Sequence, residues 1–157
     1  MKKIVTNLII IYLSILNGQD LTTYVLCEGN FGSANSSLWA FNNLSEEEIN
    51  GPIYWDENSN PLGDVGQSMI IKNEKLYIVM NNSHSIEVMN LYSGFASYDT
   101  TLYLPNASPR YMAVKDDYGY LSCWNLNAIL VINLNNHEVM DTILVSGMPE
   151  VLIQADN

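Results

Sequence analysis

Short runs of alternating apolar and polar residues recur along the chain, separated by the turn-forming residues Asn, Asp, Gly and Ser. This alternation has the period of a β-strand with one buried face, and the chain divides into strands without a helix of any length. The clearest runs are residues 76–80 with 85–91, and residues 119–124 with 129–134. The pattern predicts an all-β chain.

The second pair of runs repeats the first about 43 residues further along the chain. The shared positions are Tyr77/Tyr120, Asn82/Asn125, Ile86/Ile129, Val88/Val131, Asn90/Asn133 and Leu91/Leu134. A fainter copy precedes them at residues 24–27 and 38–42. A repeat of this length made of short strands is typical of a four-stranded β-propeller blade. An immunoglobulin-like sandwich, the rival all-β fold, does not predict repeated strand sequences.

The repeats predict about three four-stranded antiparallel blades, with strands A (innermost) to D (outermost). Blade 1, about residues 22–60, has strands B, C and a weak D at 24–27, 38–42 and 53–56. Blade 2, about 61–105, has strands A to D at 69–72, 76–80, 85–91 and 100–104. Blade 3, about 106–146, has them at 111–115, 119–124, 129–134 and 139–145. Residues 147–157 begin another blade with an A strand at 151–154.

This division leaves blade 1 without an A strand and the last A strand without a blade. Propellers usually close with about four to eight blades, so three fall short of a ring. The sequence therefore predicts either a fragment of a larger propeller or a chain that closes by self-association.

The first 18 residues predict a secretory signal peptide. Two lysines, Lys2 and Lys3, precede an apolar run over residues 8–16, and small or polar residues follow it up to Gly18. A transmembrane anchor is the alternative, but the run is shorter than the ~18 to 20 apolar residues that spanning requires. We therefore expect an exported protein, in the periplasm or at the cell surface or outside it, with no transmembrane segment once the signal is removed.

The charge balance excludes one class of partner. The chain has 17 acidic and six basic residues and a formal net charge of −11, which becomes more negative when the signal is removed. Nucleic-acid binding needs a basic face that the few scattered cations cannot form. Acidic runs such as residues 46–48 are expected to form a solvated surface.

The two cysteines, Cys27 and Cys123, occupy the same place in the B strands of blades 1 and 3. A whole blade lies between them, whereas a disulfide needs α-carbons within about 7 Å. We therefore expect two free, mostly buried thiols.

In a propeller, the B-to-C loops and the D-to-A connections project from one face, around the central funnel. The candidate ligand-binding residues are Glu28, Asn30, Phe31, Asn81, Asn82, His84, Trp124, Asn125 and Asn127 from the loops, and Asp64, Gln67, Arg110, Tyr111 and Glu150 from the connections. Amides with a few aromatic rings suit a neutral or mixed polar and apolar ligand.

Each candidate has a structural alternative. The asparagines are turn formers, and Trp124 can pack between blades. Arg110 can form a salt bridge to Asp64 or Asp116 instead of contacting a ligand.

No catalytic constellation, metal site or cofactor site is recognisable. His84 and His137 fall in loops on opposite faces and cannot share a metal. No Cys/His cluster has zinc spacing, and no acidic loop approaches the EF-hand pattern. We expect a protein that is not an enzyme.

Three motifs resemble the YncE-like propellers exported by Bacteroidetes-type bacteria. They are YVLCEGNFG at residues 24–32, PLGDVGQSM at 61–69 and LYIVMNNS at 76–83, and SPRY at 108–111 continues the match. The resemblance implies a seven-bladed ring, of which this chain would be a part. Some members bind cobalamin at the cell surface and sit on TonB-dependent outer-membrane transporters. This sequence departs from the family at Cys27, where Asn is usual, and in lacking the lipoprotein cysteine of surface-anchored members.

The leading hypothesis is a non-enzymatic binding propeller that captures a small molecule, such as a corrinoid, at the funnel face. A TonB-dependent transporter is a partner that the resemblance implies. The alternatives are a scaffold that recognises a protein or a surface polymer, and a propeller enzyme whose site lies in further blades.

Overall fold

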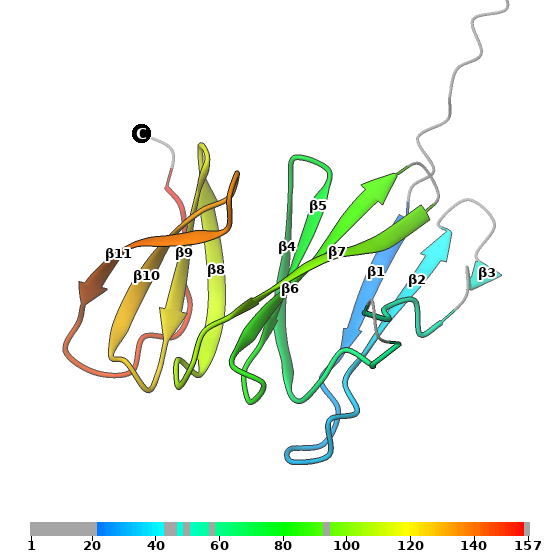
Figure 1. Ribbon diagram of the computed structural model, residues 1–157, viewed down its shortest axis with the longest axis horizontal. Helices are drawn as coiled ribbons and strands as arrows, with labels where there is room; N and C mark the ends of the chain where they lie inside the picture. Colours follow the sequence, from blue (N-terminus) through cyan, green and yellow to red (C-terminus); the bar gives the residue numbers. More distant parts are fainter. Residues whose placement is uncertain (1–21, 43–46, 49–50, 57–58, 93–94, 156–157) are drawn as a thin grey trace, which may run out of the picture.

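The computed structural model describes residues 22–42, 47–48, 51–56, 59–92 and 95–155. Their regular structure is entirely β-strand, in three antiparallel sheets, which confirms the predicted all-β fold (Figure 1). The predicted signal peptide lies outside the described residues. None of the described residues forms a helix long and apolar enough to cross a membrane.

Each sheet is a meander in which every strand pairs with the next along the chain. The first sheet contains β1 (Thr22–Cys27), β2 (Ser37–Asn42) and β3 (Glu47–Glu48). The second contains β4 (Gly66–Lys72), β5 (Lys75–Met80), β6 (Ser85–Tyr92) and β7 (Phe95–Tyr103). The third contains β8 (Pro109–Lys115), β9 (Tyr118–Cys123), β10 (Ala128–Asn133) and β11 (Glu138–Leu144). The sheets stand side by side in chain order, as successive propeller blades do (Figure 1).

Alternation along the strands builds a separate core on each side of the second sheet. On β6, Ile86 and Val88 pack with Leu121 and Leu130 against the third sheet. Met89, one position out of phase, packs with Leu38 against the first sheet. Both faces of the central blade are therefore apolar, and its strands read as nearly continuous hydrophobic runs.

The first sheet departs from the predicted strands. Residues 53–56 form no strand, and the two-residue β3 pairs with β2 at Phe41 and Asn42 instead. Ile53 still donates its backbone N–H to the carbonyl of Leu38, over 2.8 Å. The apolar residues 53–54 gave a strand-like pattern because Tyr54 is buried, at 2% exposure, against the second sheet.

Two other expectations are corrected. Residues 151–154, the predicted opening A strand, form no strand, because the described residues place no partner strand beside them. Cys27 is exposed, whereas Cys123 is buried, because none of the three described sheets covers the face of β1 that carries Cys27. Both thiols are free, as predicted.

A buried carboxyl group joins the first two blades. Glu87 on β6 is 5% exposed and accepts hydrogen bonds from Tyr54 at 2.6 Å, Ser85 at 2.7 Å and Thr101 at 2.5 Å. Tyr54 comes from the segment that follows β3, so this bond crosses between blades. The equivalent position in the third blade is the apolar Leu130, so the core between the second and third sheets has a leucine where the first interface has this carboxyl group.

Stability is expected to fall as the pH rises above about 9, where an unfolded cysteine begins to ionise, and more steeply above about 10, where an unfolded tyrosine does. Burial raises the pKa of the Tyr54 and Tyr77 hydroxyls above their ordinary value of 10.0, and burial raises the pKa of the Cys123 thiol to about 12. Because these groups ionise more readily in the unfolded chain, their stabilisation is complete below the unfolded pKa and is lost as the pH climbs toward the folded one. The expected loss is up to about 1.4 kcal/mol per pH unit for each group.

Urea denaturation at several pH values between 8 and 11.5 measures this slope. The variant Tyr54→Phe is expected to show a shallower slope than the wild type. An unfolding free energy that stays constant between pH 9 and 11 contradicts the assignment of these buried hydroxyls.

Candidate functional site

The loops predicted to surround the funnel do meet at one end of the sheets, the lower end in Figure 1. The loop after β5 is hydrogen-bonded to the connection that leads into β4, through Asn81 N–H and the Val65 carbonyl at 2.8 Å. The loop after β9 is joined in the same way to the connection into β8, through Trp124 N–H and the Ser108 carbonyl at 3.1 Å. Polar side chains from successive blades are thereby brought together.

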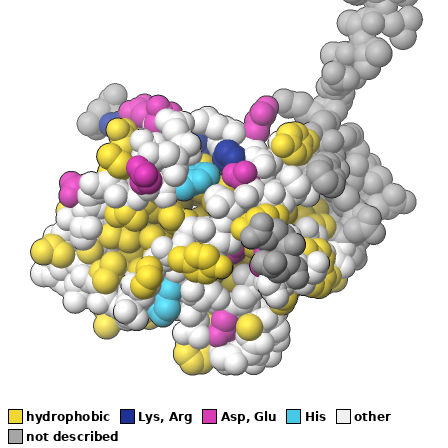
Figure 2. All heavy atoms as spheres, in the orientation of Figure 1, with side chains coloured by type: hydrophobic (Ala, Val, Ile, Leu, Met, Phe, Trp, Pro, Cys, Tyr) yellow, Lys and Arg dark blue, Asp and Glu magenta, His cyan; other side chains and the backbone are white. Residues whose placement is uncertain are grey.

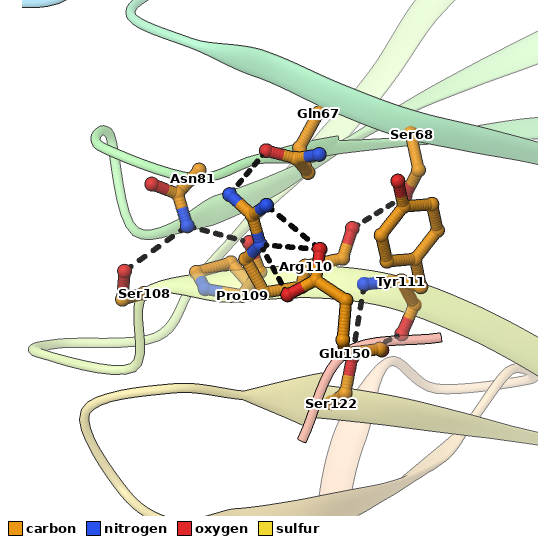
Figure 3. Close-up of polar contacts among 9 residues, drawn as sticks. All are labelled: Gln67, Ser68, Asn81, Ser108, Pro109, Arg110, Tyr111, Ser122 and Glu150. Carbon is orange, nitrogen blue, oxygen red and sulfur yellow. Dashed lines mark hydrogen bonds and ion pairs between the residues drawn. The ribbon is translucent and has the colours of Figure 1, made fainter. Parts of the chain in front are cut away.

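Arg110, near the start of β8, is the centre of this group (Figure 3). Its guanidinium donates to both carboxylate oxygens of Glu150, through Nε at 3.1 Å and through Nη2 at 2.7 Å. Its Nη1 donates to Oε1 of Gln67 on β4. Glu150 is therefore the ion-pair partner of Arg110, and the predicted partners Asp64 and Asp116 are wrong.

The guanidinium also stacks on an aromatic ring. Its central carbon lies 3.9 Å from the ring centroid of Trp124, which is within the range of a cation–π interaction. The Trp124 indole N–H is buried and has no hydrogen-bond partner among the described residues. The Trp124 ring therefore stacks on the Arg110 guanidinium, while its indole N–H makes no hydrogen bond among the described residues.

Gln67, Arg110 and Glu150 occupy equivalent positions in three successive repeats. Each is the second residue of its motif: Gly66-Gln67-Ser68-Met69, Pro109-Arg110-Tyr111-Met112 and Pro149-Glu150-Val151-Leu152. The repeats place this position at corresponding points, and the side chains of Gln67 and Glu150 both contact Arg110. We call these three residues the axial row. Its amide, cation and carboxylate give no net charge.

Side chains behind the axial row fix its backbone. Ser68 Oγ donates to the carbonyl of Arg110 at 2.7 Å, and Ser122 Oγ donates to the carbonyl of Glu150 at 2.6 Å. Asn81 Nδ2 donates to the Pro109 carbonyl and to Ser108 Oγ, both at 3.0 Å. Sequence reasoning missed Ser68 and Ser122. A polar residue inside an apolar strand, as Ser122 is between Leu121 and Cys123, was the signal that could have found the second.

A second polar group forms where the β1–β2 loop crosses the connection before β4. Asp64, which is 8% exposed, accepts at Oδ2 from the backbone N–H of Gly32 at 2.9 Å and from Asn82 Nδ2 at 2.6 Å. The Asn82 amide, followed by backbone amides of the β1–β2 loop including that of Gly32, holds the pKa of the Asp64 carboxyl below its usual value. Asp64 therefore anchors this loop.

The other sequence candidates take varied positions. The Glu28 carbonyl accepts from Gly66 N–H at 3.2 Å, and Asn30 N–H donates to Asn35 Oδ1 at 2.7 Å. Phe31 projects from the loop and is 78% exposed.

The remaining candidates lie near the third sheet. His84 Nδ1 accepts from the Ser108 N–H at 2.9 Å. Tyr111 is half-buried on β8, and Asn125 and Asn127 lie exposed in the β9–β10 turn. The structure thus brings Gln67, Arg110, Trp124 and Glu150 into one group and gives Asn81, Asn82 and His84 hydrogen bonds within the loops.

The described residues contain no cluster of three or more His, Cys, Asp or Glu side chains that could hold a metal ion. What this end of the molecule offers instead is a stacked guanidinium, a partly exposed carboxylate and amide groups. In proteins, groups of these kinds are used to recognise ligands through hydrogen bonds and stacking.

The comparison with family models found one matching family. The family described as "Domain of unknown function (DUF5074)" matches residues 22–157. No curated protein matches the chain. Among solved structures, apo AztD from Citrobacter koseri matches with 14% sequence identity and a TM-score of 0.49, over 85% of this chain and 35% of that one. The chain thus spans about a third of the length of AztD.

Proposed function

The chain belongs to the family of domains of unknown function DUF5074, and we propose that it is an exported, non-enzymatic binding domain that holds a small molecule on the axial row. The observation that carries the proposal is the contact of Gln67, Arg110 and Glu150 beside the ring of Trp124. These residues come from three successive repeats, so the packing of the blades assembles one recognition surface.

The charge of the axial row selects the class of ligand. Arg110 and Glu150 cancel, so a strongly charged ligand would find no uncompensated partner. The Arg110 guanidinium uses its Nε–H and one N–H of each terminal nitrogen in hydrogen bonds to Glu150 and Gln67. Two of its five N–H groups remain to donate to a ligand acceptor. The half-exposed Glu150 can accept from a ligand donor. The surface therefore suits a neutral or zwitterionic molecule that carries both donors and acceptors.

A corrinoid is the most specific ligand that the resemblance to YncE-like propellers implies. Cobalamin is neutral overall and rich in amide side chains, which matches the chemistry of the axial row. Export, and a transporter partner in the outer membrane, are proposed on the same resemblance and on the sequence of the first 18 residues.

Removal of the stacking ring is expected to weaken ligand binding at least tenfold. In Trp124→Ala the guanidinium loses its cation–π contact and is free to leave the position set by Glu150. Calorimetric titration of the full exported chain with cyanocobalamin, followed by a set of neutral and zwitterionic metabolites, measures the affinity.

The matched control is Trp55→Ala, which removes a half-exposed tryptophan outside the axial row. Its affinity is expected to equal that of the wild type. If cyanocobalamin gives no heat, the corrinoid proposal fails. If no compound of the set binds, or if both variants lose affinity equally, the axial row is not the binding site.

A further inference from the structure

One position in each sheet lies where a loop can hold the entry to the next sheet. It is the residue directly before β2, β6 and β10, which is Ser36, His84 and Asn127 in turn. Ser36 Oγ accepts from the backbone N–H of Gly66, at the start of β4, at 2.9 Å. His84 Nδ1 accepts from the backbone N–H of Ser108, just before β8, also at 2.9 Å. In both cases this side chain fixes the backbone that leads into the following inner strand.

Of these three residues, only the histidine has a side chain of a type that takes up a proton between about pH 5 and pH 8. The backbone does not require it. The φ angle is +54° at His84 and +46° at Asn127, and the N–H of each donates to the carbonyl three residues earlier. Asparagine is among the residues that adopt this left-handed conformation most readily. The third sheet thus forms the same turn with a residue that does not titrate.

Ser108 connects His84 to the axial row. It is buried, and its φ of +48° lies in the left-handed region, which a residue with a side chain keeps only where its surroundings hold it. Its carbonyl accepts from the Trp124 N–H at 3.1 Å, and Arg110 follows two positions later. The bond from Ser108 to His84 therefore helps to position both the stacking ring and the guanidinium.

Only an unprotonated Nδ1 can make this bond. A neutral imidazole accepts at one nitrogen, whereas an imidazolium donates at both. Protonation at Nδ1 therefore turns two N–H groups toward each other, one from His84 and one from Ser108, and leaves the buried Ser108 N–H without its acceptor. The loss of a buried acceptor favours movement of the Ser108 backbone out of its left-handed conformation.

Among the described residues, no charged group pairs with the His84 ring. Its own turn carries no other titratable side chain, and the neighbouring elements carry Asp64 before β4, Tyr103 at the end of β7 and Arg110 on β8. The Asp64 carboxylate is bonded to the β1–β2 loop and the β5–β6 turn, Arg110 is paired with Glu150, and Tyr103 is largely exposed. A proton on His84 therefore gains no ion pair in exchange for the lost hydrogen bond.

The second histidine provides a matched control. His137 lies in the β10–β11 turn, at the other end of the sheets, and its φ of +59° is close to that of His84. Figure 2 shows one histidine toward the lower end of the molecule, where the loops of the candidate site meet, and another toward the upper end. The ring of His137 stands edge-on to Tyr77, with centroids 6.0 Å apart. His137 thus has a similar backbone conformation away from the axial row.

We propose that His84 is a positioning residue that makes ligand binding on the axial row depend on pH. Neutral His84 holds Ser108, which keeps Arg110 and Trp124 in place for the ligand. Protonated His84 releases Ser108, so the ligand is held at neutral pH and released in acid. This inference rests on the proposed function of the axial row, but the release of Ser108 can be measured without a ligand.

The first measurement is hydrogen exchange in the full exported chain without ligand, followed on peptides that cover residues 104–114. In His84→Asn, Oδ1 takes the place of Nδ1 and accepts from Ser108 at any pH. Near pH 8 the variant and the wild type are expected to exchange alike. Near pH 5 the wild type is expected to exchange about tenfold faster, with unchanged circular dichroism. Comparison at equal pH cancels the intrinsic pH dependence of exchange.

His137→Asn is expected to follow the wild type at both pH values. Equal exchange in the wild type and His84→Asn near pH 5 overturns the proposal. A loss of the acid-induced change in His137→Asn as well overturns it too, because the change would then not belong to His84.

The second measurement is calorimetric titration with cyanocobalamin. The wild type is expected to bind about fivefold more weakly near pH 5 than near pH 8, whereas His84→Asn binds equally at both. An acid-induced loss of affinity that persists in His84→Asn overturns the role given to His84. If cyanocobalamin gives no heat with either protein at either pH, the corrinoid proposal fails, and hydrogen exchange still decides whether His84 positions the axial row.

Discussion

Replacement of Glu87 by alanine is expected to lower the free energy of unfolding by roughly 3 to 5 kcal/mol. The carboxyl group accepts from Tyr54, Ser85 and Thr101 inside the interface between the first two blades. Truncation leaves the buried hydroxyl groups of Tyr54 and Ser85 without this acceptor and the half-buried one of Thr101 with only the Tyr98 hydroxyl nearby, and it leaves a cavity as well. Urea denaturation followed by circular dichroism measures the loss.

Two further variants separate the hydrogen bonds from the lost volume. Glu87→Gln keeps the shape and one acceptor oxygen, so its cost should be about half that of the alanine variant. Tyr54→Phe removes one donor and is expected to cost about 1 kcal/mol alone, and less in the Glu87→Ala background. Additive effects of Tyr54→Phe and Glu87→Ala would mean that the bond at 2.6 Å contributes nothing to stability.

Replacement of Asp64 by alanine is expected to cost roughly 2 to 3 kcal/mol and to release the β1–β2 loop. The carboxylate is the acceptor for Gly32 N–H and for the Asn82 amide. Faster hydrogen exchange at Gly32, with unchanged exchange at β9, measures the local release. The unrelated variant Asn136→Ala, in the exposed β10–β11 turn, is the control and should alter neither quantity.

The contribution of Asp64 depends on pH with a definite sign. Because the folded-state pKa of this carboxyl is lowered, its stabilisation is complete above the unfolded pKa of about 4 and is lost as the pH falls through the folded pKa. The stability difference between the wild type and Asp64→Asn should therefore shrink steadily below pH 4. A difference that is the same at pH 7 and at pH 2 contradicts the role given to the carboxylate.

The strands of the second and third sheets could be predicted from sequence because both faces of the central blade are buried. The run from Leu76 to Met80 is buried throughout, and its copy on β9 keeps Tyr120 in the same place. Burial by neighbouring blades imposes the pattern, and the repeat shows it twice. The start of β7 at Phe95 was missed, because the predicted D strand began only at residue 100, whereas the pairing with β6 continues across a register shift at Val88 and Met89.

The first sheet was harder to predict because it has a neighbour on one side only. Tyr54 resembled a strand residue in the sequence because it is apolar. In the structure it lies in no strand, and it is buried in the core against the second sheet, where its hydroxyl donates to Glu87. The predicted burial of Cys27 was wrong for the same reason.

Within the candidate site, the composition of the loops was predictable and the contacts were not. Arg110 was expected to pair with a carboxylate, yet no local pattern identifies Glu150, which lies in the following repeat. Only the equivalence of Gln67, Arg110 and Glu150 relates these residues, and their contacts with Arg110 are evident only in the structure.

The three residues of the axial row are separate from the residues that build the two hydrophobic cores. One position per repeat lies at the axis, and it holds an amide, a cation and a carboxylate in turn, while the apolar positions around it continue to form the same blade. Substitutions at Gln67, Arg110 or Glu150 are therefore expected to leave the cores on either side intact. Under the proposed function, changing these three residues retunes ligand preference on one unchanged architecture.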